Sequence, residues 1–280
     1  MAISSMLVPV STYDERDALV LQYACGLWTQ SVRRLLVATA VESEGVEAPV
    51  IPKEMDRARQ RLAAMAQSTK ECPMEIEWRV VAGDTRQAVL GLAGQADVDV
   101  ICCGTEGKSV VDYLFSGSVS EDIVSSGNVR TMTVRYDLLD AAEDPGDLAR
   151  DFARRLVIPT DFSATASRAF LSAFDRPAGN IDTLYVVHVL PETATENERF
   201  EAEVMLRGNA AMAREQGVEC VCELRTGIDP VDVVLEYVKE VNATGVITGR
   251  KGRGRLSKAV LGSLSMTLLR EAPCPVVVQP

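Results

Sequence analysis

The stretch Gly249-Arg-Lys-Gly252-Arg-Gly-Arg-Leu-Ser-Lys-Ala-Val-Leu-Gly262-Ser263 decides the predicted fold. It follows the apolar run Gly245-Val-Ile-Thr248 and precedes a segment with helical periodicity, so we expect a strand, a basic glycine-rich loop and then a helix. Glycines let backbone N–H groups approach an anion, and a helix N-terminus adds favourable partial charge. The stretch is therefore typical of a loop that binds phosphate.

The charge of this loop is opposite to that of the chain, which carries a net charge of −11. The cations of the loop are Arg250, Lys251, Arg253, Arg255 and Lys258. A positive cluster on an acidic protein favours an anionic ligand. The acidic total, with a pI of 4.8, argues against general nucleic-acid binding, which normally requires a basic domain.

The glycine spacing occurs twice in the chain. Gly104 and Gly107 are followed by Gly117-Ser118, at the same separations that join Gly249, Gly252 and Gly262-Ser263. Each copy also follows an apolar, strand-like run. Such agreement at several positions predicts a tandem repeat.

These motifs resemble the universal stress protein family, whose nucleotide-binding members carry Gly-x2-Gly-x9-Gly-(Ser/Thr) after their fourth strand. The family's first strand ends in Pro-x-Asp, and the second half of the chain has Pro159-Thr160-Asp161 at that place. The first half has Pro9-Val10-Ser11, with serine in place of the aspartate. The resemblance covers nearly the whole chain, as two family domains in series.

The resemblance implies that the second half binds an adenine nucleotide, ATP or AMP, with Mg²⁺ as an optional companion. Thr160 and Val189 would contact adenine, and Asp161 would hold the ribose. Gly249, Gly252, Gly262 and Ser263 would bind the phosphates; Arg250, Lys251 and Arg253 are added from their charge alone. The predicted site residues are Pro159, Thr160, Asp161, Val189, Thr248, Gly249, Arg250, Lys251, Gly252, Arg253, Gly262, Ser263 and Leu264.

The first copy of the motif predicts a weaker site. Ser11 is a poorer ribose acceptor than aspartate, and Glu106 and Asp112 place carboxylates, which repel phosphate, in the loop. Its predicted residues are Val10, Ser11, Gly104, Gly107, Gly117 and Ser118. We expect tight binding in the second half only.

The order of apolar runs and helical patterns predicts an α/β fold, as two tandem doubly wound domains that each have a five-stranded parallel sheet. The expected strands are Met6–Ser11, Leu35–Val41, Glu75–Val81, Val98–Cys103 and Val129–Arg135, then Leu156–Thr160, Thr183–Leu190, Val218–Arg225, Thr244–Thr248 and Pro275–Gln279. Acidic residues and a Pro-Gly pair mark 138–152 as the linker, so the domains are expected at 1–137 and 153–280.

Three other nucleotide or catalytic motifs fail on spacing. Gly107-Lys108-Ser109 resembles the end of a P-loop, but Cys102 stands where its first glycine belongs. The chain has no Gly-x-Gly-x-x-Gly after a first strand and no Gly-x-Ser-x-Gly elbow. We therefore expect no catalytic residues and at most slow ATP hydrolysis. A nucleotide-free interaction module and an ATP-hydrolysing enzyme are the alternatives to a nucleotide-binding regulatory or sensor protein of the stress response.

The cysteines and the single histidine have mainly structural interpretations. The seven cysteines are too sparse for a disulfide framework, and those in apolar runs are expected to be buried. Cys220-Val-Cys222 would place two thiols on one face of a strand, where a metal site or an oxidant sensor is a less favoured alternative. His188 lies in an apolar strand, where a lone histidine is usually structural, although the family often has His-Val here.

Location and assembly are predicted from apolar runs. No run approaches the ~20 residues of a membrane span, and the N-terminus lacks signal-peptide features, so we expect no membrane contact and a cytoplasmic protein. The two fifth strands, Val129–Arg135 and Pro275–Gln279, are expected at sheet edges that invite pairing. We expect them to form an intramolecular pseudo-dimer, and a homodimer is also possible; no protein partner can be predicted.

Overall fold

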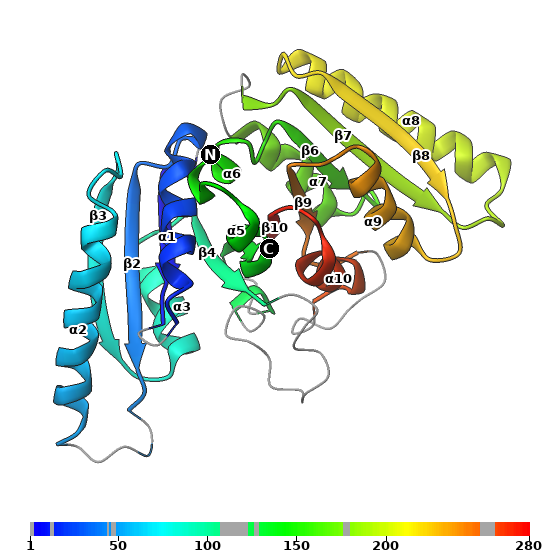
Figure 1. The fold of residues 1–280 in the computed structure, drawn as a ribbon. Coiled ribbons are helices and arrows are strands. Elements are labelled where there is room, and N and C mark those ends of the chain that lie inside the picture. The colour runs from blue at the N-terminus through cyan, green and yellow to red at the C-terminus, as the bar shows by residue number, and fades with distance from the viewer. Residues whose placement is uncertain are drawn as a thin grey trace. The chain divides into compact units, whose positions relative to one another are not determined.

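The computed structural model describes residues 3–11, 14–43, 45, 49–106, 123–125, 129–175, 180–252 and 261–280. The chain divides into two compact units (Figure 1). The first domain comprises Ala2–Glu106 and Val110–Arg150, and the second comprises Asp151–Pro280. Each is described by itself below.

The first domain is built on a parallel sheet in the order β3-β2-β1-β4-β5. Its strands are β1 (Ser5–Pro9), β2 (Arg34–Val41), β3 (Glu75–Ala82), β4 (Val100–Thr105) and β5 (Arg130–Arg135). Its helices are α1 (Asp17–Gly26), the 3-10 helix η1 (Leu27–Gln30), α2 (Ile51–Ser68), α3 (Thr85–Gln95), α5 (Tyr136–Ala141) and α6 (Pro145–Arg150).

The second domain repeats this topology, in the order β10-β9-β6-β7-β8. Its strands are β6 (Arg155–Pro159), β7 (Thr183–Leu190), β8 (Cys220–Thr226), β9 (Gly245–Gly249) and β10 (Val276–Gln279). Its helices are α7 (Ala164–Ser172), the 3-10 helix η3 (Ala173–Asp175), α8 (Glu196–Glu215), α9 (Pro230–Glu240) and α10 (Ser263–Glu271). The predicted fold class is confirmed.

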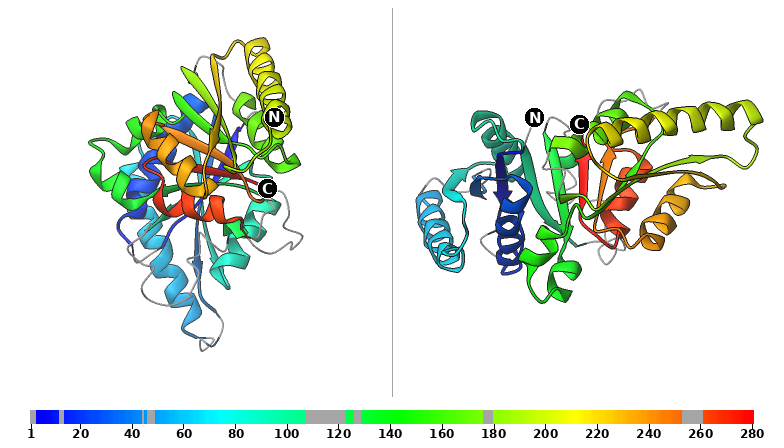
Figure 2. Two further views of the ribbon diagram at one scale, coloured as in Figure 1. Left: turned by 90° about the vertical axis from the view of Figure 1, so that its right-hand side faces the viewer. Right: turned by 90° about the horizontal axis from the view of Figure 1, so that it is seen from above.

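Helices cover both faces of each sheet because every parallel connection crosses over with the same hand. In the second domain, α8 lies on one face of the sheet, and α9 and α10 lie on the other (Figure 2). The central strands β6 and β9 are accordingly apolar and buried along nearly their whole length. Strand β3, at the end of its order, has no fully buried residue: its positions are exposed or half-buried, without a strict alternation.

Several helices of the second domain begin or end at residues that suit helix termini. Ser163 accepts a hydrogen bond from Ala166 N at the start of α7, and Asp229 caps α9, with Pro230 in its first turn. Gly217 follows α8 with a φ of +71°. In the first domain, α1 begins at Asp17, and residues 12 and 13 before it lie outside the described residues.

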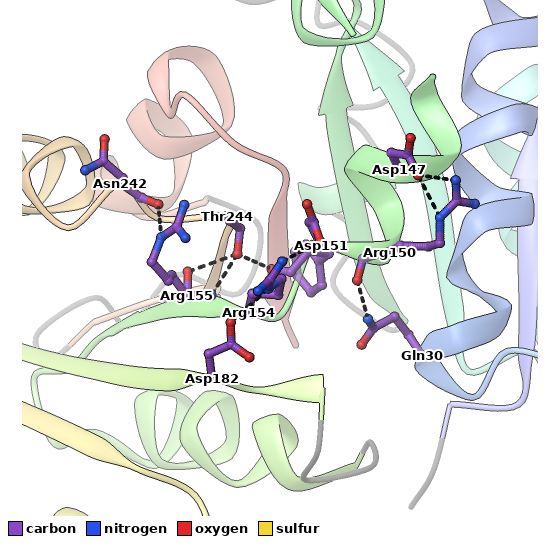
Figure 3. Close-up of polar contacts among 10 residues, drawn as sticks. Gln30, Asp147, Arg150, Asp151, Arg154, Arg155, Asp182, Asn242 and Thr244 are labelled. Carbon is purple, nitrogen blue, oxygen red and sulfur yellow. Dashed lines mark hydrogen bonds and ion pairs between the residues drawn. The ribbon is translucent and has the colours of Figure 1, made fainter. Parts of the chain in front are cut away.

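Much of the segment expected as a linker is helical. Helix α6 packs against α1 so closely that a Cβ on Gly26 would lie 2.3 Å from the carbonyl oxygen of Gly146. Gln30 Nε2 also donates to the carbonyl of Arg150 at 3.0 Å (Figure 3). Residues up to Arg150 therefore belong to the core of the first domain, because α6 completes the surface that α1 packs on.

The second domain begins with a polar anchor of its own. The Arg155 N–H donates to the Thr244 hydroxyl at 2.9 Å, and that hydroxyl donates to the carbonyl of Phe152 at 3.2 Å (Figure 3). Arg155 Nε donates to the carbonyl of Asn242 at 2.7 Å. These contacts hold the start of β6 against the turn that precedes β9.

A glycine-to-alanine pair tests the packing of α6. We expect Gly26→Ala to destabilise the first domain by about 1–3 kcal/mol, because the new Cβ overlaps α6 backbone. Gly91→Ala is the control: Gly91 has open space around it inside α3, and alanine there should stabilise by up to about 1 kcal/mol. Urea unfolding followed by tryptophan fluorescence measures this, since Trp28 and Trp78 both lie in the first domain. Equal effects at both glycines would contradict the packing.

Asp99 joins the start of β4 to the start of β1. Its Oδ2 accepts from the backbone N–H groups of Ser4 at 2.8 Å and Ser5 at 2.9 Å, and from the Ser4 hydroxyl at 3.0 Å. Burial raises the pKa of this carboxyl, but the hydrogen bonds from Ser4 and Ser5 outweigh burial and leave the pKa below its usual 3.8. The ionised carboxylate is therefore the form that stabilises the domain.

Asp99→Ala should cost about 2 kcal/mol at neutral pH, because the loss leaves backbone donors without their charged acceptor. A depressed folded-state pKa gives stability that is complete above the unfolded pKa, 3.8, and is lost as the pH falls through the folded value. The difference between parent and variant should therefore hold from about pH 7 to 5 and shrink by about pH 3. Urea unfolding at each pH measures it, with the exposed Asp140→Ala as control. If the stability difference between parent and variant did not change in acid, the stabilising role of the ionised Asp99 carboxylate would be refuted.

Candidate functional site

The strongest candidate site lies at the carboxyl ends of β6 and β9, where neighbouring strands of the second sheet lead to crossovers on opposite faces. Ligands of open α/β sheets bind at this switch point. A cavity of 270 Å³ is found there. It is lined by Pro159, Thr160, Asp161, Ala166, Val187, His188, Val189, Pro230, Val234, Thr248, Gly249, Lys251, Gly252, Gly262, Ser263, Leu264 and Ser265.

Asp161 stands just beyond β6, in a turn stabilised by its own side chain. Its Oδ1 accepts from the Ser163 N–H at 3.0 Å, and the Thr160 hydroxyl accepts from the Phe162 N–H at 3.0 Å. Phe162 adopts a φ of +59°, which is uncommon for a bulky residue. The turn therefore fixes the direction of the Asp161 carboxylate before α7 begins.

The glycines of the loop have different roles. A Cβ on Gly249 would lie 2.9 Å from the carbonyl carbon of Thr165, so this glycine is needed for the approach of α7 to β9. A Cβ on Gly252 would lie 2.8 Å from Asp161 Oδ2, so this glycine lies directly beside the carboxylate. Close packing explains both glycines: Gly249 admits the backbone of α7, and Gly252 admits the Asp161 carboxylate.

Both described ends of the loop are tied down through backbone carbonyls. The Thr165 hydroxyl donates to the carbonyl of Lys251 at 2.5 Å, and the Ser265 hydroxyl donates to that of Gly249 at 2.7 Å. The Gly262 N–H donates to the carbonyl of Arg250 at 2.9 Å. These hydrogen bonds to backbone carbonyls hold the first part of the loop, residues 249–251, in a fixed shape.

The N-terminus of α10 supplies favourable charge for an anion. Gly262 occupies the N-cap without a side-chain hydrogen bond, and the first turn of α10 carries no acidic residue. Such a helix end attracts negative charge. Lys251 lines the same cavity; loss of hydration and the nearby charge of Arg250 both hold its pKa below the usual value. A bound anion would relieve that repulsion.

His188 is the chief residue that sequence reasoning assigned to structure alone. Its Nδ1 lies 2.7 Å from the carbonyl oxygen of Thr160, which can only accept, so Nδ1 carries the proton. Its ring lies 4.5 Å from that of Phe162, between centroids. His188 therefore braces the turn that holds Asp161, and it also lines the cavity. The sequence signal for this role was that His188 directly precedes Val189, which was a predicted site residue.

The predicted site residues of the second domain come together almost completely. Of the thirteen residues predicted above, the cavity lining includes all except Arg250 and Arg253. Arg250 uses its backbone instead, since its N–H donates to the carbonyl of Gln279 at 2.8 Å. Arg253 lies outside the described residues.

Other lining residues were missed because their elements carry no sequence motif for this site. They are Ala166 of α7, Val187 of β7, Pro230 and Val234 of α9, and Ser265 of α10. Pro230 and Val234 reach the cavity because α9 begins close to the end of β7. Only the fold brings that helix start to the site.

The first domain has a larger cavity, of 1140 Å³, at the matching strand ends. Val10, Ser11 and Gly104 line it as predicted, whereas Gly107, Gly117 and Ser118 lie outside the described residues. Carboxylates predominate among the described charged residues of its lining, which are Asp14, Asp17, Glu42, Glu54, Glu106, Arg57 and Arg61. This lining is unfavourable for phosphate.

In the first domain, side chains fill the space beside Gly104 at the end of β4, which corresponds to Gly249 at the end of β9. The Tyr136 ring packs on Gly104, where a Cβ would lie 2.5 Å from ring atoms, and its hydroxyl donates to Asp17 at 2.8 Å. The Ser11 N–H donates to the same carboxylate. Burial raises the pKa of Asp17, and these hydrogen bonds offset part of that rise.

An arginine completes this closure. Arg16 lies 4.3 Å from the centre of the Tyr136 ring, and it pairs with Asp14 at 2.8 Å and with Glu106. Glu106 belongs to the loop after β4, so the pair joins the two strand ends that would otherwise flank a ligand. Together these residues make the first site unlike the second.

Two features are absent from the described residues. These residues contain no group of three or more His, Cys, Asp or Glu side chains placed to bind a metal ion. Nor does any described helix combine the length and the hydrophobicity that crossing a membrane requires.

Comparisons with known proteins agree with this architecture. The model of the universal stress protein family matches residues 3–135 and again residues 153–280. Universal stress protein MJ0531 of Methanocaldococcus jannaschii is 26% identical over 160 residues, which cover 52% of this chain and 92% of that protein. The crystal structure of a universal stress protein from Archaeoglobus fulgidus has a TM-score of 0.79 and 22% identity, and covers 99% of this chain and 96% of that one. The chain therefore belongs to the universal stress protein family, with one copy of the family domain in each half.

Proposed function

We propose that the second domain binds an adenine nucleotide, and that the protein acts as a nucleotide-responsive regulator or sensor in a stress response. One observation carries the proposal: Asp161, Lys251 and the start of α10 line a single cavity at the switch point of the sheet. A carboxylate suits a ribose diol, and a cation beside a helix N-terminus suits phosphate. The resemblance of the glycine motif to that of the family agrees with this assignment of the ribose and phosphate positions.

The arrangement suggests where each part of the nucleotide lies. Asp161, whose carboxylate lies against Gly252, would accept hydrogen bonds from the ribose. The N–H groups at the start of α10, with Lys251, would bind the phosphates. Val189 and Thr160 would contact the base, beside the His188 ring that braces the turn.

Binding without rapid hydrolysis fits the described site better than catalysis. Its described ionisable lining residues are Asp161, His188 and Lys251. Asp161 and His188 already have structural partners in the turn after β6. Phosphoryl transfer relies on metal ions and a positioned nucleophile, whereas this proposal assigns Asp161 to the ribose and Lys251 to the phosphates. A phosphate-release assay tests the hydrolase alternative directly.

The first domain is proposed to bind nucleotide weakly or to serve as scaffold. Tyr136 and Asp17 occupy the space beside Gly104, and the Arg16–Glu106 pair spans the strand ends. A nucleotide in this cavity would meet a carboxylate-rich lining, and its phosphates would have to displace the contact between Tyr136 and Asp17. One strong site per chain is therefore expected.

Calorimetric titration of the full-length protein with ATP and with AMP tests the nucleotide site. We expect one strong site, and a loss of about 10- to 100-fold in affinity for Asp161→Asn, because a charge-assisted hydrogen bond is worth about 1.5–3 kcal/mol. Asparagine keeps the acceptor for Ser163, so the turn is preserved. Gly252→Ala should weaken binding similarly, since its Cβ would push against the Asp161 carboxylate, 2.8 Å away.

Asp182→Ala is the matched control for this titration. Asp182 pairs with Arg154 at the opposite end of β7, so its loss should leave affinity unchanged. If the parent protein binds neither nucleotide, the nucleotide-free interaction module becomes the better description. If binding survives Asp161→Asn and Gly252→Ala intact, the ligand occupies a different place.

A double-mutant cycle tests the closure of the first site. Gly104→Ala should destabilise the first domain by about 1–3 kcal/mol, because the added methyl group meets the Tyr136 ring. In a Tyr136→Ala background the same change should cost clearly less. Tryptophan fluorescence during urea unfolding again reports this domain alone. Additive effects of the two changes would show that Tyr136 does not occupy this place.

A further inference from the structure

A pair of thiols lies at the start of β8, apart from the nucleotide cavity. Cys220 Sγ and Cys222 Sγ are 3.5 Å apart, and both residues are partly buried. Alternate residues of a strand point to the same face, so the two side chains leave β8 in the same direction. Helix α8 packs against β8, and the backbone of its Ala210 contacts Cys222. The pair is thus sheltered but within reach of solvent.

A disulfide between these residues is disfavoured by the length of the strand. Alternate Cα atoms in a strand are about 6.6 Å apart. Disulfides usually span Cα distances of about 4.4–6.8 Å, so about 6.6 Å lies near the upper limit, and the sulfurs would have to close from 3.5 Å to about 2.05 Å. Strand β8 is held in register with β7 from Leu184↔Cys220 to Leu190↔Thr226, so it resists shortening.

A metal ion fits the same spacing without moving the backbone. Thiolate–metal bonds are about 2.3 Å long in zinc sites, so two of them in line span about 4.6 Å. The observed separation of the sulfurs is 3.5 Å, so the two side chains would have to rotate apart to hold an ion between them.

The number of protein ligands available beside the two thiols favours one kind of metal ion. Among the described residues no third His, Cys, Asp or Glu side chain completes a metal-binding group with these thiols. Thiolates suit Cu(I), zinc and iron–sulfur clusters, but structural zinc sites use four protein ligands and these clusters are held by four cysteines. A pair of sulfurs alone satisfies ions that accept two ligands.

We propose that Cys220 and Cys222 form a two-coordinate site for a soft monovalent metal ion of the Cu(I) class. The ion is held between the two thiolates under α8, with no change in its oxidation state. The thiols lie at the amino end of β8, and the nucleotide cavity lies at the carboxyl ends of the strands. The metal site is therefore independent of the proposed nucleotide site.

Anaerobic titration with Cu(I) against a chromogenic Cu(I) chelator tests the site. The full-length Cys25→Ser/Cys72→Ser variant serves as parent, because it lacks the other partly exposed thiols. We expect it to retain one equivalent of Cu(I), and Cys220→Ser or Cys222→Ser added to it to lose that equivalent. X-ray absorption should show two sulfur ligands. Far-UV circular dichroism checks that each variant is folded.

Three results would overturn the proposal. The first is stoichiometry that Cys220→Ser and Cys222→Ser leave unchanged. The second is an absorption spectrum with three or more ligands, or with nitrogen and oxygen ligands. The third is a peptide that carries a Cys220–Cys222 disulfide in place of the ion, found by mass spectrometry of the titrated protein, which would assign the pair to oxidation chemistry instead.

Discussion

The site of the second domain depends on the close approach of α7 to the end of β9. Gly249 permits it, because any side chain there would meet the backbone of Thr165. The approach brings the Thr165 hydroxyl to the carbonyl of Lys251 and the Asp161 carboxylate beside Gly252. The absence of a side chain at Gly249 thus allows a carboxylate, a cation and the start of α10 to lie around one cavity.

The two domains use the same topology but place different groups at the strand ends. In the second domain the contacts of the loop run through backbone carbonyls, which leaves the cavity to ligand-binding groups. In the first domain side chains close the corresponding place: Tyr136 covers Gly104, and its hydroxyl bonds a buried Asp17. The packing of the sheet is shared by the two domains, whereas the groups at the strand ends differ, because a fold can carry different sites.

Much of the fold could be predicted because it rests on local patterns. Apolar runs separated by helical periodicity indicated each strand, and β7 agrees with the predicted Thr183–Leu190 at both ends. Short helices without apolar periodicity were harder to predict. The acidic segment that contains α5 and α6 resembles a linker in sequence, and its helices are stabilised by packing on α1, which is distant along the chain.

By itself, the sequence determined the family, the tandem repeat and most of the residues around the second cavity, because glycine spacing and the Pro-x-Asp turn are local backbone requirements. Only the tertiary structure decided what each residue does there. It gave Gly249 a packing role and Arg250 a backbone role, and it showed that His188 braces the Asp161 turn. It also showed the Tyr136–Asp17 closure of the first site. These contacts join residues far apart in the chain, and their distances are set only when the sheet and its helices pack.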